Sequence, residues 1–97
     1  MKAMMDYRKS DRFYHESAVM VEDHRTGFKY HGLMRNYSSS GMYLESDYAP
    51  RPNRKLHITV DNLPLYSSPQ TYMAQIKWRR LLNQDSAYEY GIGVEYF

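Results

Sequence analysis

The stretch RKLHITVDN, residues 54–62, decides which kind of fold this chain adopts. Apolar side chains stand at every second position, at Leu56, Ile58 and Val60, and polar side chains occupy the positions between them. A period of two is that of an extended strand with one buried and one solvated face. The stretch therefore predicts a β-strand that borders a hydrophobic core.

Similar short runs recur along the chain, separated by turn residues such as glycine, asparagine and proline. None of them shows helical periodicity. The predicted strands lie at 17–23, 28–36, 41–47, 54–62, 71–80 and 88–97. Because no helix is available to cover the apolar face of the sheet, the sheet must curl on itself. We therefore expect an all-β fold, a closed or nearly closed barrel of six antiparallel strands.

Alternation also predicts which side chains fill the barrel. Trp78 belongs among them because it shares a strand face with Ile76. Gly91 and Gly93 lie on the other face of the last strand, where a close backbone approach or a tight bend would need them. The expected core is Val19 or Met20, Met34, Leu44, Leu56, Ile58, Val60, Ile76, Trp78, Ile92 and Val94.

Length and composition limit the organisation of the chain. Its 97 residues suffice for one domain. Residues 1–12 carry no strand pattern and are expected to form a flexible N-terminal arm, with the barrel at 13–97. The absence of cysteine excludes disulfides, thiolate metal sites and cysteine nucleophiles. No long apolar run and no secretory signal are present, so we expect a cytoplasmic protein without a membrane span.

Charge and side-chain chemistry argue against several function classes. The net charge of +2 is small for a dedicated nucleic-acid binder, so no DNA or RNA partner is expected. The four histidines have no metal-type spacing, so no metal is expected. The serines at 38–40 lack the G-x-S-x-G elbow of a hydrolase and have no identifiable partner base, which predicts that the chain is not an enzyme.

Two short motifs suggest a ligand. Arg8 and Arg12 stand four residues apart in the arm, and the turn NYSSSG follows at 36–41. Arginine is a planar fork that bonds phosphate and the O6/N7 edge of guanine. The turn offers an amide for a base edge, a hydroxyl, and a glycine that leaves the backbone open to approach. Together the motifs predict a ligand that carries both phosphate and guanine.

With these motifs the chain resembles the PilZ domains, bacterial receptors for cyclic di-GMP. Arg8 and Arg12 match the RxxxR motif of that family, and Asn36, Ser38 and Gly41 match its [D/N]xSxxG motif. The segments GMYLES, AQIKWRR and YEYGIGVEYF also resemble the family's later strands, so the resemblance runs from Arg8 to the C-terminus.

The resemblance implies a six-stranded antiparallel barrel of the PilZ type. It implies that Arg8 and Arg12 lie in a loop before the first strand and close over cyclic di-GMP, which Asn36, Ser38 and Gly41 bind from beneath. It also implies a non-catalytic receptor without a cofactor, which passes the signal to an unidentified effector protein as the arm becomes ordered. Two neighbours of the motifs, Lys9 and Arg35, are further candidates for phosphate contacts.

Asn36 stands where the family often has a carboxylate. An amide offers guanine one carbonyl acceptor and no charge, so we expect a somewhat weaker affinity than with aspartate. The residue before Arg8 is Tyr7 and not a further arginine, and the residue at this position can affect how many ligands bind. Binding of one ligand and binding of a stacked pair both stay open.

Other interpretations of the same residues stay open. The chain can be a PilZ-like interaction module that no longer binds nucleotide. It can also be a small barrel that binds single-stranded nucleic acid through its eleven tyrosines and its basic residues. The serine turn alone is compatible with ordinary turn chemistry, which is all that Ser39 and Ser40 require.

Overall fold

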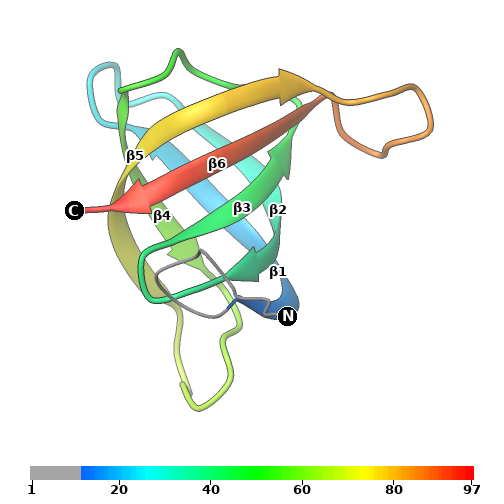
Figure 1. The fold of residues 1–97 in the computed structure, drawn as a ribbon. Helices are drawn as coiled ribbons and strands as arrows, with labels where there is room; N and C mark the ends of the chain where they lie inside the picture. Colours follow the sequence, from blue (N-terminus) through cyan, green and yellow to red (C-terminus); the bar gives the residue numbers. More distant parts are fainter. Residues whose placement is uncertain (1–11) are drawn as a thin grey trace, which may run out of the picture.

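Six antiparallel strands close into a barrel over residues 12–97, the part of the chain that the computed structural model describes (Figure 1). The order around the barrel is β1-β2-β3-β6-β5-β4, and β4 pairs with β1 to close it. The strands are β1 (Phe13–Asp23), β2 (Lys29–Tyr37), β3 (Gly41–Ser46), β4 (Lys55–Val60), β5 (Gln70–Leu81) and β6 (Tyr90–Tyr96). The predicted six-stranded barrel is confirmed. The first strand begins four residues earlier than predicted, at Phe13 rather than Ser17.

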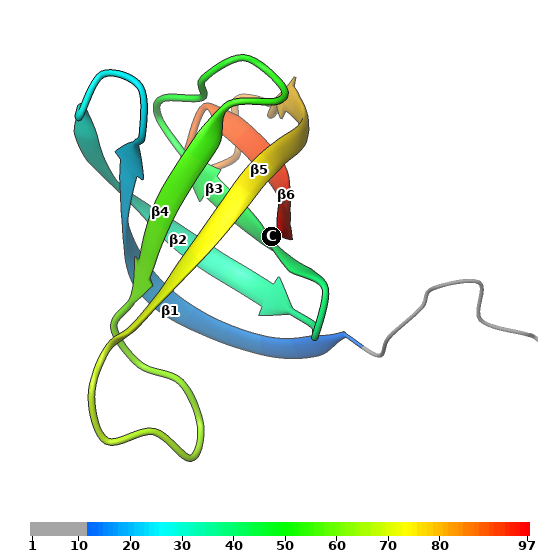
Figure 2. The same ribbon diagram turned by 90° about the vertical axis from the view of Figure 1, so that its left-hand side faces the viewer.

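The connections divide between the two ends of the barrel (Figures 1 and 2). The start of β1, the β2–β3 turn and the long β4–β5 loop lie at one end, and the other three connections lie at the opposite end. The β3–β4 connection spans that opposite end, because β3 pairs with β6 whereas β4 pairs with β1 and β5. Residues 1–11, and with them Arg8, Lys9 and most of the predicted arm, lie outside the described residues.

The inward faces of the strands form the core, as alternation predicts. Val19, rather than Met20, is the buried residue of its pair. Met42 joins the core from β3 and Ala74 from β5, and both are buried. Apart from Trp78, all the expected core residues are buried, with exposed fractions between 0% and 6%.

The prediction that Trp78 packs in the core is wrong. Ile76 pairs with Val94 and Trp78 pairs with Gly93, so β5 carries an extra residue, Lys77, relative to β6. A β-bulge of this kind reverses the alternation beyond it. Trp78 consequently faces outward and is 43% exposed, although Ile76 two positions before it is fully buried.

Candidate functional site

The structure brings the two predicted motifs into direct contact. Arg12, immediately before β1, donates a hydrogen bond from Nη1 to Oδ1 of Asn36 in β2, at 2.9 Å. The residues are 24 positions apart in the chain, and the pairing of Tyr14 with Asn36 brings them together. An arginine of the first motif and the amide of the second therefore share one place on the barrel surface.

A second bulge turns Asn36 outward. Under strict alternation Asn36 would point inward like Met34, which is two positions before it and fully buried. Met34 pairs with Leu44 and Asn36 pairs with Tyr43, so Arg35 is an extra residue in β2. Since bulges re-aim side chains, this one moves the amide from the core side to the outer surface, beside Tyr43.

Residues from five strands line up across the outer surface of the barrel at this level. The pairings join Tyr14 of β1 to Asn36 of β2, then Tyr43 of β3, Gly93 of β6 and Trp78 of β5. Neighbouring strands lie roughly 4.8 Å apart, so such a row extends over the width of a dinucleotide-sized ligand. We call these five residues the outer row.

A hollow of about 330 Å³ lies along the outer row, lined by Arg12, Asn36, Tyr43, Trp78 and Arg80. Two of these side chains are cationic and none is acidic. The guanidinium carbon of Arg80 lies 5.5 Å from the ring centroid of Trp78, within the range of a cation–π contact. The hollow therefore combines positive charge, an amide and aromatic faces, which suits an anion that carries flat bases.

The two aromatic rings of the hollow lie against β6. Tyr43 and Trp78 are stacked, with ring centroids 5.8 Å apart and ring planes 26° apart. A Cβ on Gly93 would come within 2.3 Å of the Trp78 indole, and one on Gly91 within 2.6 Å of the Tyr43 hydroxyl. The sequence predicted a close backbone approach or a tight bend at these two glycines, whereas the space above them is occupied by side chains of the neighbouring strands. We call Tyr43 and Trp78 the ring platform.

Ser38 and Gly41 shape the β2–β3 turn and do not line the hollow. Ser38 is 5% exposed, its Oγ accepts from the Ser40 N–H at 3.2 Å, and its own N–H donates to the Gly41 carbonyl at 2.8 Å. A Cβ on Gly41 would lie 2.1 Å from the carbonyl oxygen of Val94, so only glycine allows β3 to approach β6 there. Ordinary turn chemistry and tight strand packing account for both residues in the structure.

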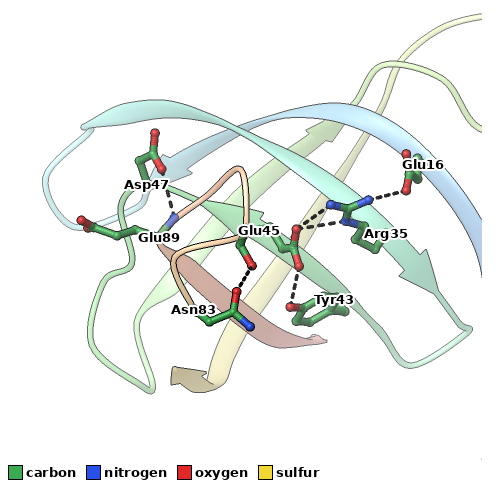
Figure 3. A network of polar contacts seen from close by, with 8 residues as sticks. Glu16, Arg35, Tyr43, Glu45, Asp47, Asn83 and Glu89 are labelled. Carbon is green, nitrogen blue, oxygen red and sulfur yellow. Dashed lines mark hydrogen bonds and ion pairs between the residues drawn. The ribbon is translucent and has the colours of Figure 1, made fainter. Parts of the chain in front are cut away.

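Arg35 is bound by two carboxylates (Figure 3). Its Nη1 contacts Glu16 at 2.5 Å, its Nε donates to Glu45 at 3.0 Å, and its Nη2 lies 2.9 Å from the same Glu45 oxygen. The hydrogen bond that Arg35 donates to Glu16 is the largest cause that raises the pKa of Arg35, and the one it donates to Glu45 follows. The side chain expected to contact phosphate is therefore neutralised locally by Glu16 and Glu45.

Sequence reasoning missed three lining residues of the hollow: Tyr43, Trp78 and Arg80. Gly91 and Gly93 were a usable signal, since two glycines on one strand face leave room for rings from adjacent strands. The bulges that expose Asn36 and Trp78 left no comparable local signal in the sequence.

Four of the tyrosines within residues 12–97 are not free to stack on a nucleic-acid strand. Tyr37, Tyr72, Tyr90 and Tyr96 pack against the buried core, and Tyr72 stacks on Tyr96 with centroids 5.1 Å apart. Burial is the largest cause that raises the pKa of Tyr72 and of Tyr96, as expected for phenols that pack inside the fold. These four rings therefore serve the barrel rather than a ladder of exposed bases.

Neither a metal cluster nor a spanning helix occurs within residues 12–97. No three His, Asp or Glu side chains of this region gather closely enough to hold a metal ion. Nor does the region contain a helix of the length and apolarity needed to cross a membrane.

The PilZ domain family model matches residues 6–97, nearly the whole chain. This chain belongs to the PilZ domain family, a family of binding and regulatory modules, and the resemblance proposed from its motifs is confirmed. Comparison with curated proteins gives no match.

Two solved structures have the same fold. The PilZ domain of CeSA from a cellulose-synthesizing bacterium superposes with a TM-score of 0.66 at 17% identity, covering 91% of this chain and 82% of that chain. The MrkH–c-di-GMP complex of K. pneumonia gives a TM-score of 0.66 at 16% identity, covering 96% of this chain and 45% of MrkH. At these identities the likeness is one of fold.

Proposed function

We propose that this chain is a receptor for cyclic di-GMP, which binds along the outer row between Arg12 and Trp78, and that it is not an enzyme. The hydrogen bond between Arg12 and Asn36 carries the proposal, because it joins the RxxxR motif to the NxSxxG motif beside a hollow without acidic groups. Membership of the PilZ family and the similarity in fold to a protein solved with c-di-GMP support the same ligand.

Four of the five lining residues suit a particular part of this ligand. Arg12 and Arg80 supply charged donors for the phosphates. We propose Arg8, at the other end of the RxxxR motif, as a third such donor. The Asn36 amide accepts from the guanine edge, and the exposed indole of Trp78 offers a stacking face. Ser38 and Gly41 act by holding the turn next to Asn36, as their burial and close packing suggest.

Binding must rearrange the contact between Arg12 and Asn36. In the free chain the Asn36 carbonyl accepts from Arg12, so a guanine that uses this carbonyl displaces the arginine toward the phosphates. We propose that this displacement orders the arm and forms a new surface for an effector protein. A nucleotide-free interaction module is the second candidate, favoured by the uncharged amide at position 36.

Titration calorimetry with cyclic di-GMP tests the proposal. Arg12→Ala removes a charged donor, whose hydrogen bonds are worth about 1.5–3 kcal/mol, so affinity should fall roughly tenfold to a hundredfold. Affinity should also fall as salt is added. Arg25→Ala is the control, since this exposed arginine lies in the β1–β2 turn, at the end of the barrel opposite the start of β1, and does not line the hollow.

Equal affinity of the wild type and Arg12→Ala would exclude the proposed site. Absence of binding at high micromolar nucleotide, with a partner protein still captured, would favour the interaction module. Binding of generic oligonucleotides without preference for cyclic di-GMP would favour a single-strand binder instead.

A further inference from the structure

Glu45 in β3 is an unusually well-bound carboxylate for an outward-facing strand position. Its side chain is 12% exposed. One oxygen accepts from Nε of Arg35 at 3.0 Å and lies 2.9 Å from Nη2, and the other accepts from the Tyr43 hydroxyl at 2.9 Å (Figure 3). Both oxygens thus have partners, and one of the partners belongs to the ring platform.

The bond from Tyr43 to Glu45 fixes the ring as well as the hydroxyl. A tyrosine side chain has two rotatable angles, so anchoring its hydroxyl over Gly91 leaves the ring little freedom. The ring then stacks on Trp78, which also packs over Gly93 and against the guanidinium of Arg80. Glu45 therefore restrains Trp78 through one intermediate ring.

The charge of Glu45 is compensated away from the proposed ligand. Glu45 lines a neighbouring hollow with Arg35 and Glu16, and it does not line the hollow of Arg12 and Trp78. Arg35 lies between the two carboxylates and neutralises part of their charge. A carboxylate close to an anion site is tolerable under these conditions, because the arginine beside it screens the ligand from its charge.

We infer that Glu45 is a positioning residue of the nucleotide site: with Arg35 it fixes Tyr43, and through Tyr43 it fixes the indole of Trp78 as a pre-formed stacking face. The inference rests on the proposed function for its ligand, and it gives Arg35 the role of holding Glu45 rather than that of binding phosphate. A pre-formed face spares the ligand the cost of immobilising side chains on binding.

Trp78 is the only tryptophan of the chain, so its fluorescence reports on the ring platform directly. We expect Glu45→Ala without ligand to shift the emission of Trp78 to longer wavelength and to increase its quenching by acrylamide. Tyr43→Phe, which loses only the hydroxyl, should reproduce the change. Glu45→Gln keeps an oxygen that accepts from Tyr43 and should restore most of the wild-type spectrum. Glu22→Ala in β1 is the control for loss of an acidic residue.

The affinity for cyclic di-GMP provides the second measurement. Glu45→Ala and Tyr43→Phe should each bind roughly twofold to tenfold more weakly than the wild type, with Glu45→Gln intermediate. All spectra and titrations are to be recorded at temperatures at which circular dichroism shows that each variant is folded. Lower stability alone then does not change the emission or the affinity.

The two readouts separate this inference from the proposed function. An unchanged Trp78 spectrum in Glu45→Ala and Tyr43→Phe would overturn the positioning role, whether or not the nucleotide binds. Changed spectra in a protein that does not bind cyclic di-GMP would support the positioning role and overturn the proposed ligand. Changed spectra with unaltered nucleotide affinity would overturn the claim that the position of Trp78 affects nucleotide binding.

Discussion

Asn36 shows how one side chain sets the chemistry of this surface. It faces outward only because Arg35 is an extra residue, and its carbonyl accepts from Arg12. A carboxylate in its place would accept from two guanine donors with charge assistance, but it would also attract Arg12 more strongly. Whether an aspartate at position 36 strengthens or weakens nucleotide binding depends on which of these two effects is larger.

We expect Asn36→Asp to bind cyclic di-GMP about threefold to tenfold more tightly. An exposed ion pair with Arg12 is worth about 0–1 kcal/mol, less than the roughly 1.5–3 kcal/mol of hydrogen bonds to a charged group. Calorimetry measures the difference, and Asn36→Ala should bind more weakly than either. A weaker Asn36→Asp would mean that release of Arg12 dominates.

Gly41 is the residue of the second motif whose role in the fold is clearest. Gly41→Ala should lower the free energy of unfolding by about 1–3 kcal/mol or more, because the new methyl group would meet the Val94 carbonyl of β6. Urea unfolding measures the loss. Ser39→Ala, at an exposed position of the same turn, should change it by less than about 0.5 kcal/mol. Similar values for both variants would argue against the tight contact between β3 and β6.

At the scale of the elements, bulges decide which side chains are available for binding. The pairings shift in β1 between Tyr14 and Ser17, in β2 at Arg35 and in β5 at Lys77, and all three shifts lie next to the outer row. Each shift changes the face on which the following residues lie. The site is therefore a property of strand pairing as much as of motif residues.

Truncation of Ile76 should mainly affect stability, and truncation of Trp78, two positions further along β5, should mainly affect binding. Ile76→Ala empties a fully buried position and should cost about 2–5 kcal/mol of stability. Trp78→Ala removes a half-exposed stacking ring and should cost less stability while weakening nucleotide binding roughly tenfold. Thermal unfolding and calorimetry on both variants check this. A large loss of stability in Trp78→Ala with unchanged nucleotide affinity would show that the indole supports the fold and does not contribute to binding.

For the molecule as a whole, one buried carboxylate joins two connections at the end of the barrel opposite the β2–β3 turn. Asp23, 1% exposed at the end of β1, is paired with Arg54 just before β4 and accepts from the backbone N–H of Arg25 at 2.9 Å. These bonds join the β1–β2 turn to the connection between β3 and β4. The chain has no disulfide to perform this task, because it has no cysteine.

We expect Arg54→Ala to destabilise the protein by about 3 kcal/mol, since it leaves the Asp23 carboxylate buried without its charged partner. Arg51→Ala, an exposed arginine of the same connection, is the matched control and should stay within about 0.5 kcal/mol of the wild type. Nucleotide affinity should be unchanged in both at temperatures where they are folded, because neither arginine lines the hollow of Arg12 and Trp78. Equal stability of the two variants would show that the Asp23–Arg54 pair contributes little.

Alternation along the strands was enough to predict the fold class and most of the core. Leu56, Ile58 and Val60 alternate because one strand face meets apolar neighbours and the other meets water, and such a pattern is legible without any partner strand. The sequence also reveals the motif residues, because they are particular residue types at fixed spacing. These are Arg12, Asn36, Ser38 and Gly41.

Pairing between strands determines which side chains lie on the outer row. Asn36 and Trp78 would both point inward by alternation, yet both lie on the outer row, and Ser38 turns into its own hairpin. The physical reason is that a bulge depends on pairing between strands distant in sequence, so no local period records it. The ring platform and its anchor at Glu45 arise from that pairing, since β2, β3, β6 and β5 must lie side by side before these residues can meet.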